Sequence, residues 1–109
     1  MPRFIVTGCY TQAAMKGMIA SPSDREAASA ALVKAAGGTQ EAYYATTGAT
    51  DFMLIVTVDD VSKLLAGLMV AGASGATSNL QTQRAFSSAE LTEIQKEAGK
   101  IASAYTPPG

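Results

Sequence analysis

The side chains that could do chemistry are few, and they lie in one predicted β-hairpin and one later strand. Arg84 could hold a carboxylate or phosphate through its planar guanidinium, or could pair with an acid at a subunit contact. Tyr43 and Tyr44 are adjacent in a strand, so one phenol should pack under helices while the other could orient a ligand on the opposite face. Asp51 lies in the hairpin turn, where a carboxylate usually accepts backbone hydrogen bonds, although an acid–base role stays open. These four residues are the candidate ligand-binding set.

The residues that are missing exclude most enzyme templates. The chain has no histidine, so it has no Ser-His or Cys-His nucleophile pair and no imidazole to bind zinc or haem. Cys9 is the one cysteine, and we expect a small buried hydrophobe rather than a nucleophile because no base lies beside it. The segment from Gly72 to Gly75 lacks the Lys-Ser/Thr of a phosphate-binding loop and reads as a helix stop. We therefore assign no catalytic residue and expect neither a metal nor a cofactor.

Composition limits the partners and the size of the core. The 109 residues are 48% hydrophobic and 16% charged, which fits a single domain, residues 1–109, with a modest core. A net charge of -1 without a basic cluster argues against nucleic acid. Charges or glycines interrupt every apolar run before the roughly 20 residues that a membrane span needs. With one cysteine and no apolar leader pattern, we expect a cytoplasmic protein.

The stretch that organises the chain runs from Tyr43 to Val58. A polar turn around Gly48 separates two segments rich in β-branched and aromatic residues, which predicts a β-hairpin. The most apolar of these segments begins at Phe52 and should be a central strand. The predicted strands are Arg3–Tyr10, Thr39–Thr47, Thr50–Val58 and a more polar Ser78–Phe86.

Four helices are predicted from capping residues and apolar spacing. Their expected N-caps are Thr11, Ser21 in a capping box with Asp24, Asp59 or Asp60, and Ser87 in a capping box with Glu90. Pro22 ends the first helix and Gly37-Gly38 the second. The expected inward positions are Ala14, Met15, Met18 and Ile19; Ala28, Leu32, Ala35 and Ala36; Val61, Leu64, Leu65, Leu68 and Met69; and Leu91, Ile94, Ala98, Ile101, Ala102 and Tyr105.

This order of elements predicts an α+β fold of the ferredoxin-like, split β-α-β type. Right-handed crossovers place the helices on one face of a four-stranded antiparallel sheet, and an extra C-terminal helix follows. In the third strand, Phe52 and Leu54 alternate with Met53 and Ile55, so the uncovered face of the sheet is also apolar. Such a face needs a cover, and a second subunit is the simplest one. We therefore expect a homo-oligomer, at least a dimer.

The turn Gly48-Ala49-Thr50-Asp51, followed by the apolar strand, resembles the Gly-x-Tyr-Asp turn of the GYD domain family. Thr50 stands where that signature has tyrosine, so a role that depends on that phenol is not carried over. Other similar segments extend the resemblance from Pro2 to about Leu91: Phe4-Ile5-Val6, Thr11, Lys16-Gly17, Gly37-Gly38, Tyr43-Tyr44, Asp59-Asp60 and Thr82-x-Arg84-Ala85-Phe86. The resemblance implies a ferredoxin-like domain related to dimeric α/β barrels, and it implies no established reaction.

Two functions stay open from the sequence. The first is a homo-oligomer that binds a small molecule in or near the subunit interface. The second is a cofactor-free enzyme of the dimeric α/β-barrel type that acts on a small organic substrate with Tyr, Arg and Asp groups. The absence of histidine favours the first. The two differ in whether polar side chains converge in a closed apolar pocket.

Overall fold

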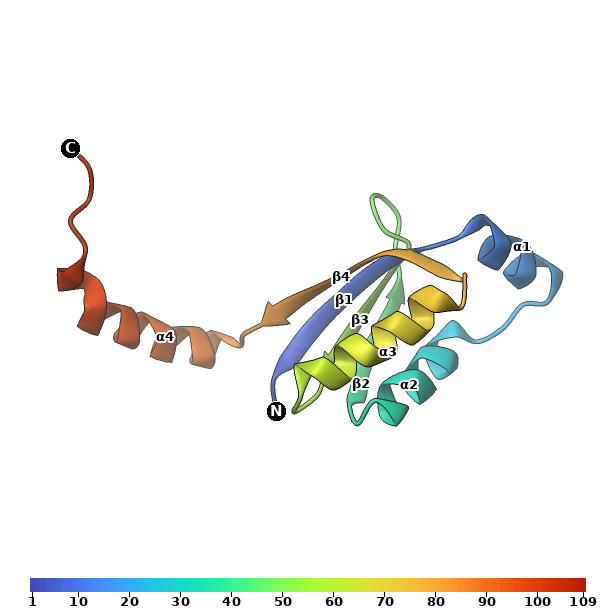
Figure 1. Cartoon of the computed structure of the whole chain (residues 1–109), viewed down its shortest axis with the longest axis horizontal. Helices are drawn as coiled ribbons and strands as arrows, with labels where there is room; N and C mark the ends of the chain where they lie inside the picture. Colours follow the sequence, from blue (N-terminus) through green and yellow to red (C-terminus); the bar gives the residue numbers. More distant parts are fainter.

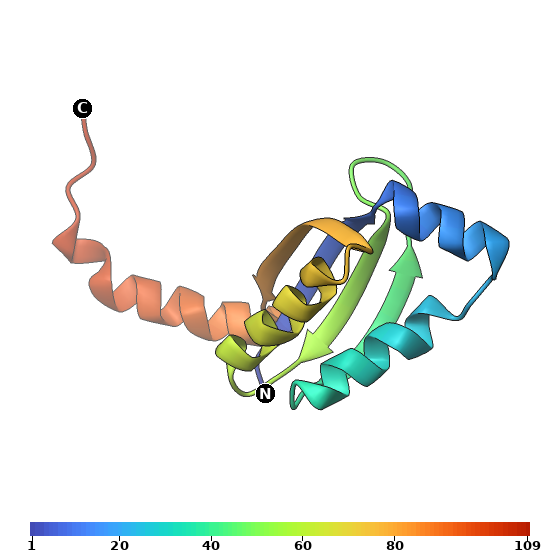
Figure 2. The same ribbon diagram turned by 45° about the vertical axis from the view of Figure 1, so that its right-hand side comes forward.

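The computed structural model describes all 109 residues and has a ferredoxin-like α+β fold, as predicted (Figure 1). The elements are β1 (Arg3–Tyr10), α1 (Gln12–Ala20), α2 (Arg25–Ala35), β2 (Thr39–Ala45), β3 (Phe52–Thr57), α3 (Val61–Ala73), β4 (Thr77–Ala85), α4 (Ser88–Ile101) and a 3-10 turn (Ala102–Ala104). The antiparallel sheet has the order β2-β3-β1-β4, and α2 and α3 cover one of its faces (Figure 2).

The two central strands, β1 and β3, supply most of the core. Their register pairs Phe4 with Val56 and Val6 with Leu54, so these four side chains point to the helix-covered face. Eight buried hydrophobic residues form the core: Phe4, Val6, Val33, Phe52, Leu54, Val56, Val58 and Leu64. Alternation sends Ile5 and Ile55, which pair with each other, to the opposite face. Both of these are only partly buried, so the second apolar face is present as expected.

The hairpin turn is longer than predicted. Strand β2 ends at Ala45 rather than Thr47, and β3 starts at Phe52 rather than Thr50. The turn closes on itself because the Thr46 N–H donates to the Asp51 carbonyl at 2.9 Å and the Thr46 hydroxyl donates to the Thr50 carbonyl at 2.8 Å. Gly48 has a φ of 103°, a left-handed conformation that glycine adopts without strain.

One predicted helix start is wrong. The N-cap of α2 is Asp24, whose carboxylate accepts the Ala27 N–H at 3.1 Å, and not Ser21. Ser21 instead ends α1, because its backbone N–H bonds to the Gly17 carbonyl. The other caps are confirmed: Thr11 caps α1, Asp60 caps α3, and Ser87 forms the capping box of α4.

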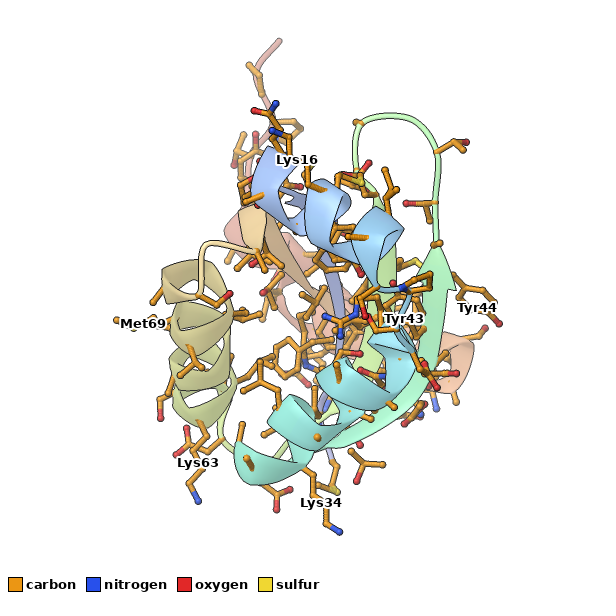
Figure 3. All side chains as sticks on the ribbon, turned by 90° about the vertical axis from the view of Figure 1, so that its right-hand side faces the viewer. Lys16, Lys34, Tyr43, Tyr44, Lys63 and Met69 are labelled. Carbon is orange, nitrogen blue, oxygen red and sulfur yellow. The ribbon has the colours of Figure 1, made fainter.

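All four helices leave some of their predicted inward positions exposed, contrary to prediction. No residue of α1 or α4 is buried, and Ile19 in α1 is 82% exposed. In α3 only Leu64 is buried, while Met69 points away from the sheet (Figure 3). Helix α4 extends away from the rest of the chain (Figure 1), which raises the radius of gyration to 17.7 Å. A compact chain of this length has a radius of gyration of roughly 13 Å.

Gly38 allows the end of α2 to approach the end of β3. A Cβ atom at this position would lie 2.7 Å from the Thr57 carbonyl oxygen, which is backbone and cannot move aside. Gly17 in α1 provides a control, since a Cβ atom there would meet nothing within 4 Å.

We predict that Gly38→Ala lowers the free energy of unfolding by about 1 to 3 kcal/mol, the usual cost of overpacking. Gly17→Ala should leave it unchanged or raise it by up to about 1 kcal/mol, because alanine is the better helix former. Urea unfolding of both variants and the wild type measures this difference. Equal transition midpoints for the two variants would contradict the close approach.

Candidate functional site

A partly open cavity of about 240 Å³ lies between the sheet and helices α2 and α3. Sixteen of its 21 lining residues are hydrophobic, so its walls are those of a core. The sheet contributes Val6, Leu54 and Val56, α2 contributes Leu32, and α3 contributes Leu68. Lining residues such as Ala28 and Val70 are also exposed, so the cavity is partly open to solvent.

The cavity exists because small residues line the two helices. Ala28 and Ala36 face it from α2, and Gly67 and Ala71 face it from α3. The helices nevertheless approach closely at one point, where a Cβ atom on Gly67 would lie 3.4 Å from the Cβ of Ala36. The helices therefore cover the sheet without filling the space beneath them.

Polar side chains gather at one end of the cavity. The hydroxyls of Tyr10, at the end of β1, and Tyr43, in β2, are 2.6 Å apart and share a hydrogen bond. The Tyr10 ring also packs against Phe52, with ring centroids 5.0 Å apart. Thr77 is the β4 partner of Tyr10 in the β1–β4 register, so the two side chains lie next to each other on the same face. Arg25, the first residue of α2, completes the polar end.

Two of these polar groups have no partner in the protein. The Arg25 Nε and the Thr77 Oγ1 are both buried and make no hydrogen bond. Buried polar atoms are nearly always paired, because an unpaired group loses its hydration without compensation. Arg25 also forms no ion pair, since the four ion pairs of the chain involve Arg3, Arg84, Lys96 and Lys100.

The phenol of Tyr10 is held in its protonated form. Burial, reinforced by the hydrogen bond with Tyr43, raises the pKa of Tyr10 well above its ordinary value, although the nearby Arg25 charge acts in the opposite direction. Two neutral phenols carry two protons, and one of these is used between their oxygens. One phenolic O–H is therefore free to donate to another group.

A second pocket of about 220 Å³ adjoins the polar end beneath α1. It shares Tyr10, Arg25 and Ala76 with the main cavity, and Ala14 and Met18 of α1 form its other side. Arg25 therefore borders both spaces, and α1 lies over the polar end rather than over the apolar one.

The structure does not bring the four predicted site residues together. Tyr43 lines the cavity, whereas Tyr44 points from the opposite face of the sheet and is 58% exposed (Figure 3). Asp51 does not line the cavity, and its carboxylate accepts the Tyr10 N–H at 2.9 Å. Arg84 also lies outside it, with its guanidinium 4.3 Å from the centre of the Phe86 ring.

Sequence reasoning missed Tyr10, Arg25 and Thr77. Tyr10 could have been found, because it has the same parity along β1 as the buried Phe4 and Val6. Arg25 was missed because placing the helix cap at Ser21 moved it away from the first residue of the helix. Thr77 was missed because the last strand was predicted to begin at Ser78, whereas β4 begins at Thr77.

The fold and cavity define a ferredoxin-like α+β domain with a partly open apolar pocket that has a polar end. The family model of the GYD domain matches residues 4–95, so the chain belongs to the GYD domain family. This confirms the resemblance seen in the sequence. No curated protein matches the chain, and no solved structure does.

No group of three or more His, Cys, Asp or Glu side chains is arranged to hold a metal ion. None of the helices combines the length and apolar character that crossing a bilayer requires.

We predict that Ala71→Leu fills part of the cavity and raises the free energy of unfolding by about 1 to 2 kcal/mol. The three added carbons enter apolar space that already exists, and each buried methylene contributes up to about 0.8 kcal/mol. Ala31→Leu, at an exposed position of α2, is the matched control and should change stability little. Urea unfolding measures both variants. A destabilised Ala71→Leu would show that the space is too small to accept a side chain.

Proposed function

We propose that this GYD-domain protein is a homo-oligomer that binds a small, mostly apolar molecule in the cavity of each chain. The observation that carries the proposal is the cavity itself, with core-like walls and polar groups confined to one end. This is the usual form of a small-molecule site, in which apolar walls give affinity and a few polar groups fix orientation. The sequence suggested a site in or near the subunit interface, whereas the cavity favours a site within one chain.

The size of the cavity limits the ligand. An engineered apolar cavity of about 150 Å³ accepts benzene. A space of about 240 Å³ should hold a somewhat larger molecule, such as a substituted ring or a branched chain. Because small residues on two helices keep this space open, a single larger side chain should close it.

Binding is favoured over catalysis by the state of the polar groups. An enzyme without a cofactor would need a base in the cavity, and the raised pKa of Tyr10 makes its phenol a poor base near neutral pH. Asp51, which the sequence offered as an acid–base group, makes a backbone hydrogen bond outside the cavity. Arg25 and Thr77 can orient a ligand but are not arranged with a partner that would activate a nucleophile.

A second copy of the chain is the partner that best fits the uncovered surfaces. The chain exposes 7247 Å², whereas a compact monomer of its mass exposes roughly 5,700 Å². The excess is roughly 1,500 Å² for one chain, more than the roughly 800 Å² that each partner buries in a standard interface. Two apolar surfaces are available: the open sheet face around Ile5 and Ile55, and the α4 stripe that includes Leu91 and Ile94. The side chains of Leu91 and Ile94 are each more than two fifths exposed.

We predict that Ile55→Asp shifts the protein toward the monomer. A charge placed in an apolar interface without a partner costs several kcal/mol. Ala31→Asp adds the same charge on the exposed side of α2 and should not alter assembly. Light scattering after size exclusion at micromolar concentration gives the mass of each form. A wild type that is already monomeric there would contradict the oligomer.

The ligand site is tested separately with toluene, a neutral probe that fits the cavity. We predict that toluene raises the melting temperature of the wild type and of Ala31→Leu but not of Ala71→Leu. A ligand that binds only the folded chain stabilises it by about 2.7 kcal/mol at a hundred times its Kd. Equal shifts in all three proteins would mean that the probe binds elsewhere.

A further inference from the structure

We propose that the ligand is a small organic monoanion, a carboxylate on an aryl or branched alkyl body, with its carboxylate held by Arg25, Thr77 and the tyrosine pair. This inference rests on the proposed function, since it names the class of molecule that the same cavity would take. It is argued only from the charge and the hydrogen-bond donors at the polar end, and not from the apolar walls of the cavity.

The first step is the charge of the lining. Arg25 is the one charged residue that borders the main cavity, and no Asp or Glu borders either this cavity or the pocket beneath α1. A guanidinium beside apolar space and without an acidic partner favours an anion and disfavours a cation. A single cation balances a single negative charge, so a monoanion fits better than a phosphate dianion.

The second step is the count of donors. Arg25 Nε is a donor that makes no hydrogen bond, and the Thr77 hydroxyl can donate as well as accept. The Tyr10–Tyr43 pair keeps one O–H free because its other proton is shared between the two oxygens. A carboxylate is acceptor-only and offers about four lone-pair sites to such donors.

The third step is convergence. Tyr10 connects the group, because its hydroxyl meets that of Tyr43 at 2.6 Å and its strand position pairs with Thr77. Arg25 lines both pockets together with Tyr10, and its charge acts on the Tyr10 phenol. The donors therefore come from β1, β2, β4 and the first turn of α2 to one end of an apolar space.

The test uses two isosteric probes, phenylacetate and phenylacetamide, which differ in charge at the same position. Calorimetry at neutral pH should show the wild type preferring phenylacetate by about ten- to a hundredfold, the usual effect of charge-assisted hydrogen bonds. Arg25→Met keeps much of the stem and should lose this preference. Arg25→Lys keeps the charge without the fork and should retain only part of it.

Lys34→Met is the matched control, because it removes one positive charge from the same helix at an exposed position away from the cavity (Figure 3). It should keep the full preference for phenylacetate. Circular dichroism melting of each variant verifies that the chain is folded at the temperature of the titration. Equal losses in Lys34→Met and Arg25→Met would overturn the specific role of Arg25 and indicate an effect of net charge.

The two proposals fail in different ways. A wild type that binds phenylacetamide as tightly as phenylacetate, or that binds toluene but neither of these probes, would overturn the anion and leave the apolar site intact. A wild type that binds none of the three probes at millimolar concentration would overturn both the anion and the proposed function.

Discussion

The pairing of β1 with β3 is the constraint on which the rest of the structure depends. A slip of one residue between them would send Phe4 and Val6 to the open face and remove the core. The hairpin turn fixes the register at one end, because Asp51 donates its N–H to the Gly8 carbonyl at 2.8 Å and accepts the Tyr10 N–H at 2.9 Å. Asp51 is therefore a positioning residue for Tyr10. The same contacts that set the sheet also set the polar end of the cavity.

The cavity lowers the stability of the folded chain, and this cost is an argument that the cavity serves a function. Larger side chains at Ala71 or Ala28 would bury more apolar area, and pairing Arg25 or Thr77 would remove a desolvation cost. The chain has neither the larger side chains nor the paired polar groups, although only ten of its residues are buried and its core is small. Departures from good packing and from full hydrogen bonding concentrate where function requires them. Here both departures occur in the same space.

The sequence predicted what local rules determine. Alternation gave the strands, and the capping box of Ser87 with Glu90 gave the start of α4. It failed where two local signals compete, as at Ser21 and Asp24, which are both good caps three residues apart. It also could not predict that α4 leaves the domain, because an apolar stripe indicates that something covers the helix but not which chain supplies the cover. The site was predicted least well, since it joins residues that are far apart in the sequence.

The two arginines show why residue type alone does not identify a ligand site. The Arg84 Nη2 lies 3.7 Å from the Glu90 Oε2. The same guanidinium lies over the rings of Phe4 and Phe86 and donates hydrogen bonds to the carbonyls of Arg3 and Ala85. Its Nη1 donors and its charge are therefore engaged within the chain, and they attach the first turn of α4 to the end of β4.

Arg25 has none of these partners and borders an apolar space. The guanidinium that the sequence favoured is therefore occupied by the chain itself, and the one it missed is free to meet a ligand. What separates the two is the set of groups that the fold places around each, which the spacing of residues along the chain does not record. Because Arg84 contacts α4 while Arg25 borders the cavity, the surface proposed for assembly and the site proposed for the ligand lie on separate parts of the molecule.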